Sequence, residues 1–229
     1  MRFFSYRIHL LNKQAELARF CSNRELRKVS GLFGGDVVNV SGWRDEDKEG
    51  GHYRDYFSNA TSYTITNYSG KKGYQNQDGE VFLDLSLPLP DSLPGRFDVV
   101  FNHTTLEHIF DFRVAFKNMV QMSRDVLIVV VPFCQCSHEL DSFKDYWRFT
   151  PSALRTMYEL EGMTIIYEAS NQHTGAASYL FFVGSRKPEK YFGKMPPWKP
   201  LGKQCAWIGR RRWFGPLTYA WIERSKEGR

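Results

Sequence analysis

Two apolar runs in the middle of the chain lead directly into histidine and carboxylate side chains. The first, FDVVFNHTTLEHIF, contains His103, Glu107 and His108. Imidazole and carboxylate groups bind metals and carry protons. The stretch could therefore form a metal site, a cofactor-binding strand end, or a buried strand followed by an ordinary turn. Because His103 and His108 are five residues apart, whereas zinc histidines on one helix are four apart, we expect no metal. His103 is then a candidate cofactor contact, while Leu106 packs inward and Glu107 and His108 cap the next element.

The second run, DVLIVVVPF, leads into the segment CQCSHELDSFKDYWRF. This segment contains four polar side chains that could act on a bound acceptor: His138, Asp145, Tyr146 and Arg148. A neutral imidazole with a pKa near the working pH can remove the proton of a hydroxyl group, so His138 is the candidate catalytic base. Asp145, Tyr146 and Arg148 are candidate substrate contacts. The alternative is structural: His138 hydrogen-bonds a loop carbonyl, while Tyr146, Trp147 and Arg148 fix the loop to the next helix.

The apolar pattern predicts the sheet that must position these residues. Between residues 35 and 185, short apolar runs alternate with helix-like segments, as in βαβ proteins with a largely parallel sheet. We predict seven strands, at residues 36–40, 62–66, 80–85, 97–102, 125–131, 163–169 and 177–184. Helices are predicted at FDFRVAFKNMVQMS and TPSALRTMYELEG, the second with Thr150 as N-cap and Pro151 at its first position. The loop NQHTGA predicts a final hairpin, and hence an antiparallel last strand.

Four short segments follow the first four predicted strands: NVSGW, TNY, LDL and NHTTLEH. Ligands of open parallel sheets bind at the carboxyl ends of the strands, so these segments hold the candidate cofactor contacts. They are Ser41, Gly42, Asn67, Asp84, Leu85, Asn102 and His103.

Residues 35–186 resemble the class I S-adenosylmethionine-dependent methyltransferases, in particular type 11-like members associated with sugar and surface-glycan chemistry. The resemblance is carried by VFLDLSLPLPDSLPGRFDVVFNHTTLEHIFD, AFKNMVQMSRDVLIVVVPF, DYWRFTPSAL and the closing hairpin. It implies a Rossmann-like α/β fold with a seven-stranded, mostly parallel sheet and helices on both faces. It also implies S-adenosylmethionine across the strand ends, with Asp84 and Leu85 beside the adenine, and Asn102 and His103 beneath the sulfonium.

Two positions depart from the family pattern and keep a second function open. The turn NVSGWRDEDKEGG retains only Gly42 of a glycine-rich turn, and Asn67 stands where a carboxylate usually holds the ribose. We expect methyl transfer to an oxygen of a sugar or lipid-linked glycan. The alternative is a catalytically inactive methyltransferase fold that serves as a binding or scaffolding module. The acidic pair Asp45 and Asp47 is expected to lie in a solvated turn.

The excess positive charge of the chain lies in its C-terminal tail. Residues 186–229 carry 12 Lys and Arg against 3 Asp and Glu, and four of the six tryptophans. This mixture suits contact with an anionic membrane surface, and equally an acidic glycan or nucleic acid; the alternative is an arm packed on its own domain or on a second subunit. We do not expect a nucleic-acid substrate, because a Pro-Pro-Tyr-type motif is absent near the fourth strand.

Composition predicts a cytoplasmic protein divided into an N-terminal helical segment (1–34), a methyltransferase-like domain (35–186) and a basic aromatic extension (187–229). The hydrophobic share of 42% and charged share of 24% are ordinary for a soluble globular protein. The four cysteines lack C-x-x-C spacing, which favours reduced thiols. The longest apolar run, residues 126–131, is too short to span a bilayer, so we expect membrane contact only through the tail, at the inner face.

Overall fold

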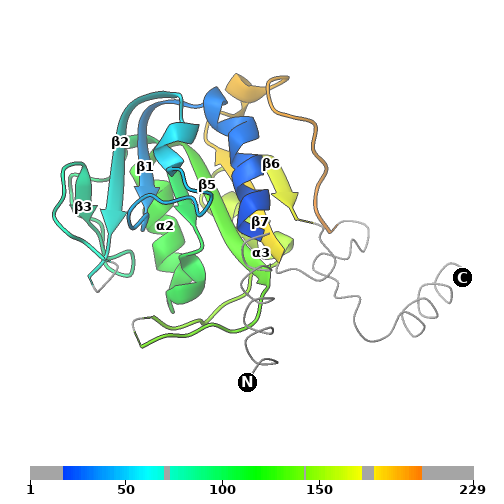
Figure 1. Cartoon of the computed structure of the whole chain (residues 1–229). Helices are drawn as coiled ribbons and strands as arrows, with labels where there is room; N and C mark the ends of the chain where they lie inside the picture. The colour runs from blue at the N-terminus through cyan, green and yellow to red at the C-terminus, as the bar shows by residue number, and fades with distance from the viewer. Residues whose placement is uncertain (1–17, 70–72, 142, 172–177, 203–229) are drawn as a thin grey trace, which may run out of the picture.

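A seven-stranded sheet forms the centre of the part of the chain that the structure describes. The computed structural model describes residues 18–69, 73–141, 143–171 and 178–202 (Figure 1). The strands are β1 (Gly34–Val40), β2 (Asn59–Asn67), β3 (Glu80–Phe82), β4 (Phe97–His103), β5 (Ser123–Cys134), β6 (Thr164–Ser170) and β7 (Ser178–Ser185). Their order is β3-β2-β1-β4-β5-β7-β6. β7 runs antiparallel to β5 and β6, and the other neighbouring pairs are parallel, which confirms the predicted fold class.

Helices cover both faces of this sheet, as predicted. Helices α2 (Phe112–Met122) and α3 (Pro151–Leu160) pack on one face, in a core that includes Phe116 and Leu154. A helix described over residues 18–29, dark blue in Figure 1, packs on the other face through side chains that include Leu26. Short 3₁₀ helices complete the described elements: η1 (Ser30–Leu32), η2 (Tyr53–Tyr56), η3 (Leu106–His108) and η4 (Pro188–Tyr191).

Strand β5 shows why the central strands read as continuous apolar runs. Val126, Ile128 and Val130 belong to the core beneath the N-terminal helix, whereas Leu127 and Val129 belong to the core beneath α2 and α3. Successive side chains of a strand point to opposite faces, and both faces are covered here, so every position favours an apolar residue. Residues 126–131, the six consecutive apolar residues of this strand, are each at most 1% exposed.

Helix α3 begins as its sequence predicts. The Thr150 side chain accepts a hydrogen bond from the Ala153 N–H at 3.2 Å, and Pro151 occupies the first turn. Both features satisfy or remove amide donors that lack partners at a helix start. Further along α3, the buried Tyr158 hydroxyl donates to the Leu127 carbonyl of β5 at 3.1 Å and thereby ties the helix to the sheet.

The third strand is shorter than predicted, because the chain turns before residue 85. β3 ends at Phe82, and the Asp84 carboxylate accepts hydrogen bonds from the Ser86 N–H at 2.9 Å and hydroxyl at 2.6 Å. A side-chain acceptor two residues before a donor closes a tight turn. Asp84 and Leu85 therefore lie after the strand end, and not inside the strand.

The two terminal segments are packed against the domain as far as they are described. Trp198 and Tyr191 pack against the same core as the N-terminal helix, and Arg155 donates to the Leu201 carbonyl at 2.6 Å. Most of the basic aromatic tail, residues 203–229, lies outside the described residues, and so does the start of the N-terminal segment. Within the described part of the chain, no helix has the length and apolar character needed to cross a membrane.

Close packing between α3 and β7 generates a stability prediction. A Cβ added at Gly184 would overlap the buried ring of Tyr158, so we expect Gly184→Ala to lower the free energy of unfolding by about 1–3 kcal/mol. Chemical denaturation measures the change. Gly31→Ala is the matched control, because its added Cβ would meet only ordinary contact with Ser58. An equal effect of both substitutions would contradict this account of the packing.

Candidate functional site

A cavity of about 700 Å³ opens at the carboxyl ends of β1, β2, β3 and β4. Its lining residues follow these four strands and the end of β5: Ser41, Trp43, Asn67, Tyr68, Ser69, Gly73, Leu83, Asp84, Leu85, Ser86, Thr104, Thr105, His108, Ile109, Phe110, Asp111, Phe143 and Tyr146. The chain passes from β1 outward to β2 and β3 and then returns to β4 on the other side. This reversal is the point where open α/β sheets bind ligands.

The structure brings five of the predicted site residues to this cavity. They are Ser41, Asn67, Asp84, Leu85 and Tyr146. The other six do not line it: Gly42, Asn102, His103, His138, Asp145 and Arg148. A smaller cavity of about 570 Å³ shares Trp43 and Gly73 with the first. Its walls come from the loop after β1 and from the β2–β3 edge, so it lacks the β4 end.

The loop after β1 is held by a buried carboxylate. Asp45 is 0% exposed and accepts hydrogen bonds from Asn39 Nδ2 at 2.7 Å, the Tyr63 hydroxyl at 2.6 Å and the Arg54 N–H at 2.9 Å. Asp47 is also buried, and its carboxylate accepts from Tyr56 and from two backbone amides. The expectation of a solvated turn at this acidic pair is therefore wrong, because donors from β1, β2 and η2 surround it.

Asn67, expected at the ribose, forms a paired contact with the backbone of Trp43. Its Oδ1 accepts from the Trp43 N–H at 2.8 Å, while its Nδ2 donates to the Trp43 carbonyl at 3.1 Å and to Glu80 at 2.6 Å. The amide thus places Trp43 at the cavity wall. Gly42 has a different constraint, because a Cβ there would overlap the Asn39 side chain. Cofactor contacts by Asn67 and Gly42 stay predictions.

Asn102 and His103 lie on opposite sides of the β4 end. Asn102 donates to the Val40 carbonyl at 2.9 Å and so links β4 to β1 at the switch point. His103 packs against Tyr53 and Tyr179 on the face that carries the N-terminal helix, with Nε2 2.8 Å from the Ser22 hydroxyl. Burial, together with the charge of Arg19, holds the pKa of His103 well below its usual range. Neither side chain reaches the cavity wall, so their contacts with the cofactor stay predictions.

The predicted substrate contacts Asp145 and Arg148 bind each other. Arg148 donates to both carboxylate oxygens of Asp145 at 2.6 Å, and to the carbonyls of Gln135 and Cys136. Burial alone would raise the pKa of Asp145, but hydrogen bonds from Arg148 and from the His138 N–H lower it to about 2. The pair closes the loop after β5, which is the structural alternative considered for this segment. A role in substrate binding stays a prediction.

The loop after β5 is docked onto η3 through Glu107. The Glu107 carbonyl accepts from the Tyr146 N–H at 2.8 Å and the Trp147 N–H at 3.3 Å. Its carboxylate is 0% exposed, and burial raises its pKa to about 8. His108, beside it, lines the cavity and is in ring contact with His138, with centroids 5.1 Å apart. The predicted base His138 therefore stands behind His108, one side chain away from the cavity.

Several residues that line the cavity were not among the predicted site residues. Thr104 and Thr105 follow β4 directly, and the aromatic rings of Tyr68 and Phe110 stand at the rim, 53% and 69% exposed. His108 was considered only for packing, capping or metal binding. The signal that could have found these residues is their position after the predicted second and fourth strands, because all such residues approach the same edge of the sheet.

The buried carboxylate of Asp45 generates a prediction about the cavity wall. Asp45→Asn replaces an acceptor oxygen with an amide donor that faces other donors, so we expect the free energy of unfolding to fall by about 1–3 kcal/mol. The loop after β1 should also become more sensitive to limited proteolysis. Asp55→Asn is the matched control, because Asp55 is exposed in the same loop. Equal stability of the two variants would show that the buried hydrogen bonds do not hold the loop.

Comparison with known proteins identifies the fold. No family model and no curated protein sequence matches the chain, whereas solved structures do. A 1,6-didemethyltoxoflavin-N1-methyltransferase from Burkholderia thailandensis, with bound S-adenosylhomocysteine, is 13% identical and covers 79% of this chain and 85% of its own, with a TM-score of 0.50. The N-methyltransferase NodS from Bradyrhizobium japonicum, also with S-adenosylhomocysteine, is 12% identical. It covers 73% of this chain and 86% of its own, with a TM-score of 0.50. Magnesium protoporphyrin IX methyltransferase from Synechocystis is 12% identical and covers 76% of this chain and 86% of its own, with a TM-score of 0.50. The chain therefore has the fold of S-adenosylmethionine-dependent methyltransferases.

Proposed function

We propose that the protein transfers a methyl group from S-adenosylmethionine to a hydroxyl oxygen of a sugar or lipid-linked glycan. The observation that carries the proposal is the cavity at the β1/β4 switch point, whose walls come from the segments after four neighbouring strands. Its volume of about 700 Å³ lies in the range of small-molecule sites. Structures of the same fold were crystallised with S-adenosylhomocysteine, the product of the donor.

The cavity walls suit the chemistry of the donor. Leu83 and Leu85 are buried apolar side chains that can flank the adenine, and Asp84 supplies a carboxylate at the rim. The indole of Trp43 adds a flat aromatic surface on the β1 side. A nucleoside needs apolar walls for its base and acceptors for its hydroxyls, and these residues provide both.

The acceptor side of the cavity is aromatic. Phe110 and Tyr146 meet edge to face with ring centroids 5.3 Å apart, and Tyr68 and Phe143 line the same cavity. Aromatic faces can pack on the C–H face of a sugar ring, while neighbouring hydroxyl and carboxylate groups bind its polar edge. This composition favours a glycan acceptor. The basic aromatic extension, residues 187–229, would bring the enzyme to a membrane-borne form of that acceptor at the cytoplasmic face.

The proton of the acceptor hydroxyl is expected to leave at the end of the cavity where His108 lies. Methyl transfer in line from sulfur to oxygen requires the loss of this proton, and an imidazole is a suitable acceptor for it. His108 lines the cavity, and His138 stands in contact with it. The two rings therefore form the basic end of the site.

Titration with the donor product tests the cofactor assignment. We expect S-adenosylhomocysteine to bind the wild type, and Asp84→Asn to weaken binding about tenfold, because a charged acceptor is replaced by a neutral amide. Isothermal titration calorimetry measures both affinities. Asp91→Asn is the matched control, since Asp91 is exposed and does not line the cavity. If the wild type does not bind S-adenosylhomocysteine at millimolar concentrations, the methyltransferase proposal is wrong. The alternative function, a catalytically inactive fold that binds or scaffolds other molecules, would then remain.

A substitution behind the cavity separates chemistry from donor binding. We expect His138→Ala to lower methyl transfer by about two to four decades, as loss of a proton-transfer group does. Donor affinity should stay unchanged, because His138 does not line the cavity. A panel of glycosides and lipid-linked glycans with labelled donor measures the transfer, and calorimetry the affinity. Parallel loss of both would mean that His138 only supports the fold.

A further inference from the structure

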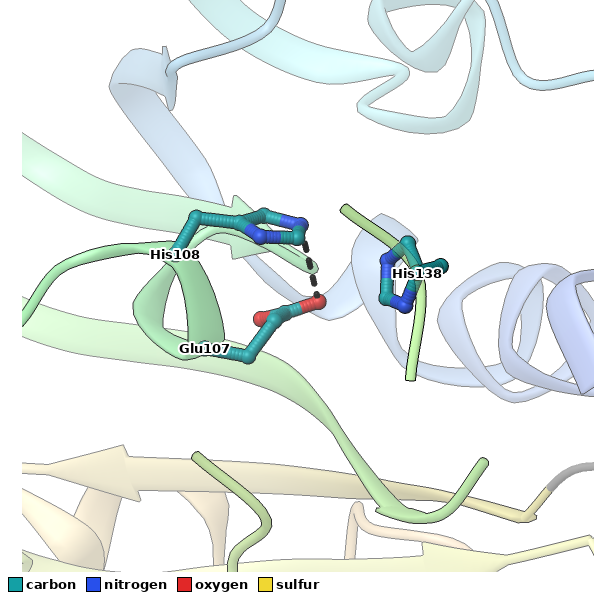
Figure 2. Close-up of side chains that lie close together, drawn as sticks. All are labelled: Glu107, His108 and His138. Carbon is teal, nitrogen blue, oxygen red and sulfur yellow. Dashed lines mark ion pairs between the residues drawn. The ribbon is translucent and has the colours of Figure 1, made fainter. Parts of the chain in front are cut away.

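Three side chains from two separate segments converge at the wall of the cavity. Glu107 and His108 belong to η3, and His138 belongs to the loop after β5. One ligand-capable atom from each lies within 4.8 Å of the others. Figure 2 shows the Glu107 carboxylate and the His108 ring side by side, with the His138 ring opposite them. The cluster thus combines two imidazoles and one carboxylate, the ligand set of a common class of metal sites.

The Glu107 carboxylate is buried without a hydrogen-bond partner. It is 0% exposed, and neither of its oxygens accepts a hydrogen bond from any described residue. Its ion-pair partner among these residues is His108, with Nε2 3.8 Å from Oε1. A buried carboxylate in this state is costly unless it carries a proton or meets a cation. The unsatisfied oxygens point to a missing positive partner.

His108 is already oriented by a neighbouring acceptor, and His138 lies beside a carboxylate. His108 Nδ1 lies 2.6 Å from the Lys144 carbonyl, so its Nδ1–H donates there and the lone pair remains on Nε2, the nitrogen that faces Glu107. His138 Nδ1 lies 3.2 Å from the Asp145 carboxylate, which Arg148 holds in place, but it forms no hydrogen bond with any described residue. A carbonyl or carboxylate behind an imidazole is the arrangement that fixes histidine ligands in metal sites.

We propose that Glu107, His108 and His138 bind one divalent transition-metal ion of the zinc class. The two imidazoles favour zinc or cobalt over magnesium or calcium, which prefer oxygen ligands. A tetrahedral zinc site with bonds of about 2.1 Å places its ligand atoms roughly 3.4 Å apart, close to the observed 3.8 Å separation within η3. Three protein ligands leave a fourth position open, as in zinc sites that bind a water or a substrate.

The open position gives the metal a role that rests on the proposed function. His108 is both a ligand of the cluster and part of the cavity wall, so a bound ion would border the acceptor space. A hydroxyl bound to zinc loses its proton more readily than a free hydroxyl. His138 would then support the loss of the acceptor proton as a ligand of the ion, so His138→Ala would still lower methyl transfer. The metal site itself needs no methyl donor and can be tested without one.

Metal titration of the chelator-treated full chain tests the proposal directly. We expect the wild type to bind one zinc ion per chain, to rise in melting temperature with added zinc, and to show the visible absorption of tetrahedral cobalt with added cobalt. Magnesium at the same concentration should neither bind at this site nor raise the melting temperature. A wild type that binds no zinc overturns the site, whatever its affinity for S-adenosylhomocysteine, so the two proposals fail separately.

Variants of two of the three proposed ligands test where the metal binds. Glu107→Gln and His138→Ala should weaken zinc binding by about a hundredfold or more, because loss of a residue that merely orients a ligand already costs 10- to 100-fold. Glu107→Gln keeps the shape of the side chain and carries no charge, so we expect it to fold, as circular dichroism will show. His52→Ala is the control, since His52 is exposed and outside the cluster, and it should bind zinc normally.

Two thiols, one at the end of β5 and one in the loop that follows it, provide the competing location for the metal. Cys134 and Cys136 are exposed, and thiolates also bind zinc. If Glu107→Gln kept its zinc while a Cys134→Ser/Cys136→Ser variant lost it, the metal would sit on the thiols and the proposal would be wrong. We expect the opposite result for both variants.

Discussion

The buried carboxylate of Asp45 is the interaction on which the geometry of the cavity depends. The chain leaves β1 without a glycine-rich turn and without a long helix before β2, so the intervening loop needs another source of order. Asp45 supplies it by accepting hydrogen bonds from β1, from β2 and from the loop itself. Hydrogen bonds to a charged group contribute about 1.5–3 kcal/mol each, more than neutral ones. The order of this loop in turn sets where Trp43 stands at the cavity wall.

The same edge of the sheet is held together by hydrogen bonds that involve the backbone, made by two asparagine side chains and by one backbone carbonyl. Asn102 ties β4 to the last carbonyl of β1, and Asn67 ties the end of β2 to Trp43. Beyond β4, the carbonyl of Glu107 holds the loop that follows β5. Each of these links joins segments that follow different strands. The walls of the cavity are therefore fixed relative to the sheet, although they consist of loops.

Much of the fold could be predicted because its signals are local. The apolar run of β5 and the Thr150–Pro151 helix start each depend on neighbouring residues alone. The early end of β3 was missed because Asp84 closes a turn that apolar content does not reveal. The sequence also grouped Asn102 with His103 beneath the cofactor. Adjacent side chains of a strand point to opposite faces, so one of the two had to leave that side.

The site was harder to predict, because its contacts join distant segments. Asp45 and Asp47 look solvated beside Arg44 and Lys48, and only the tertiary structure brings Tyr63 and Tyr56 to them. The spacing of His103 and His108 argued against a metal, yet the second imidazole of the cluster is His138, which arrives from beyond β5. Sequence spacing tests ligands within one element and is silent on such pairs.

The N-terminal helix has a consequence for how the protein can be dissected. Arg19 donates to the Thr104 hydroxyl at 3.0 Å and to the Tyr53 hydroxyl at 3.0 Å, so the helix reaches the residue that begins the cavity wall after β4. Leu26 and Val29 cover the apolar face of the sheet beneath it. A fragment trimmed to residue 35 would expose that face and release Thr104. The smallest autonomous unit of this protein therefore includes the segment upstream of its first strand.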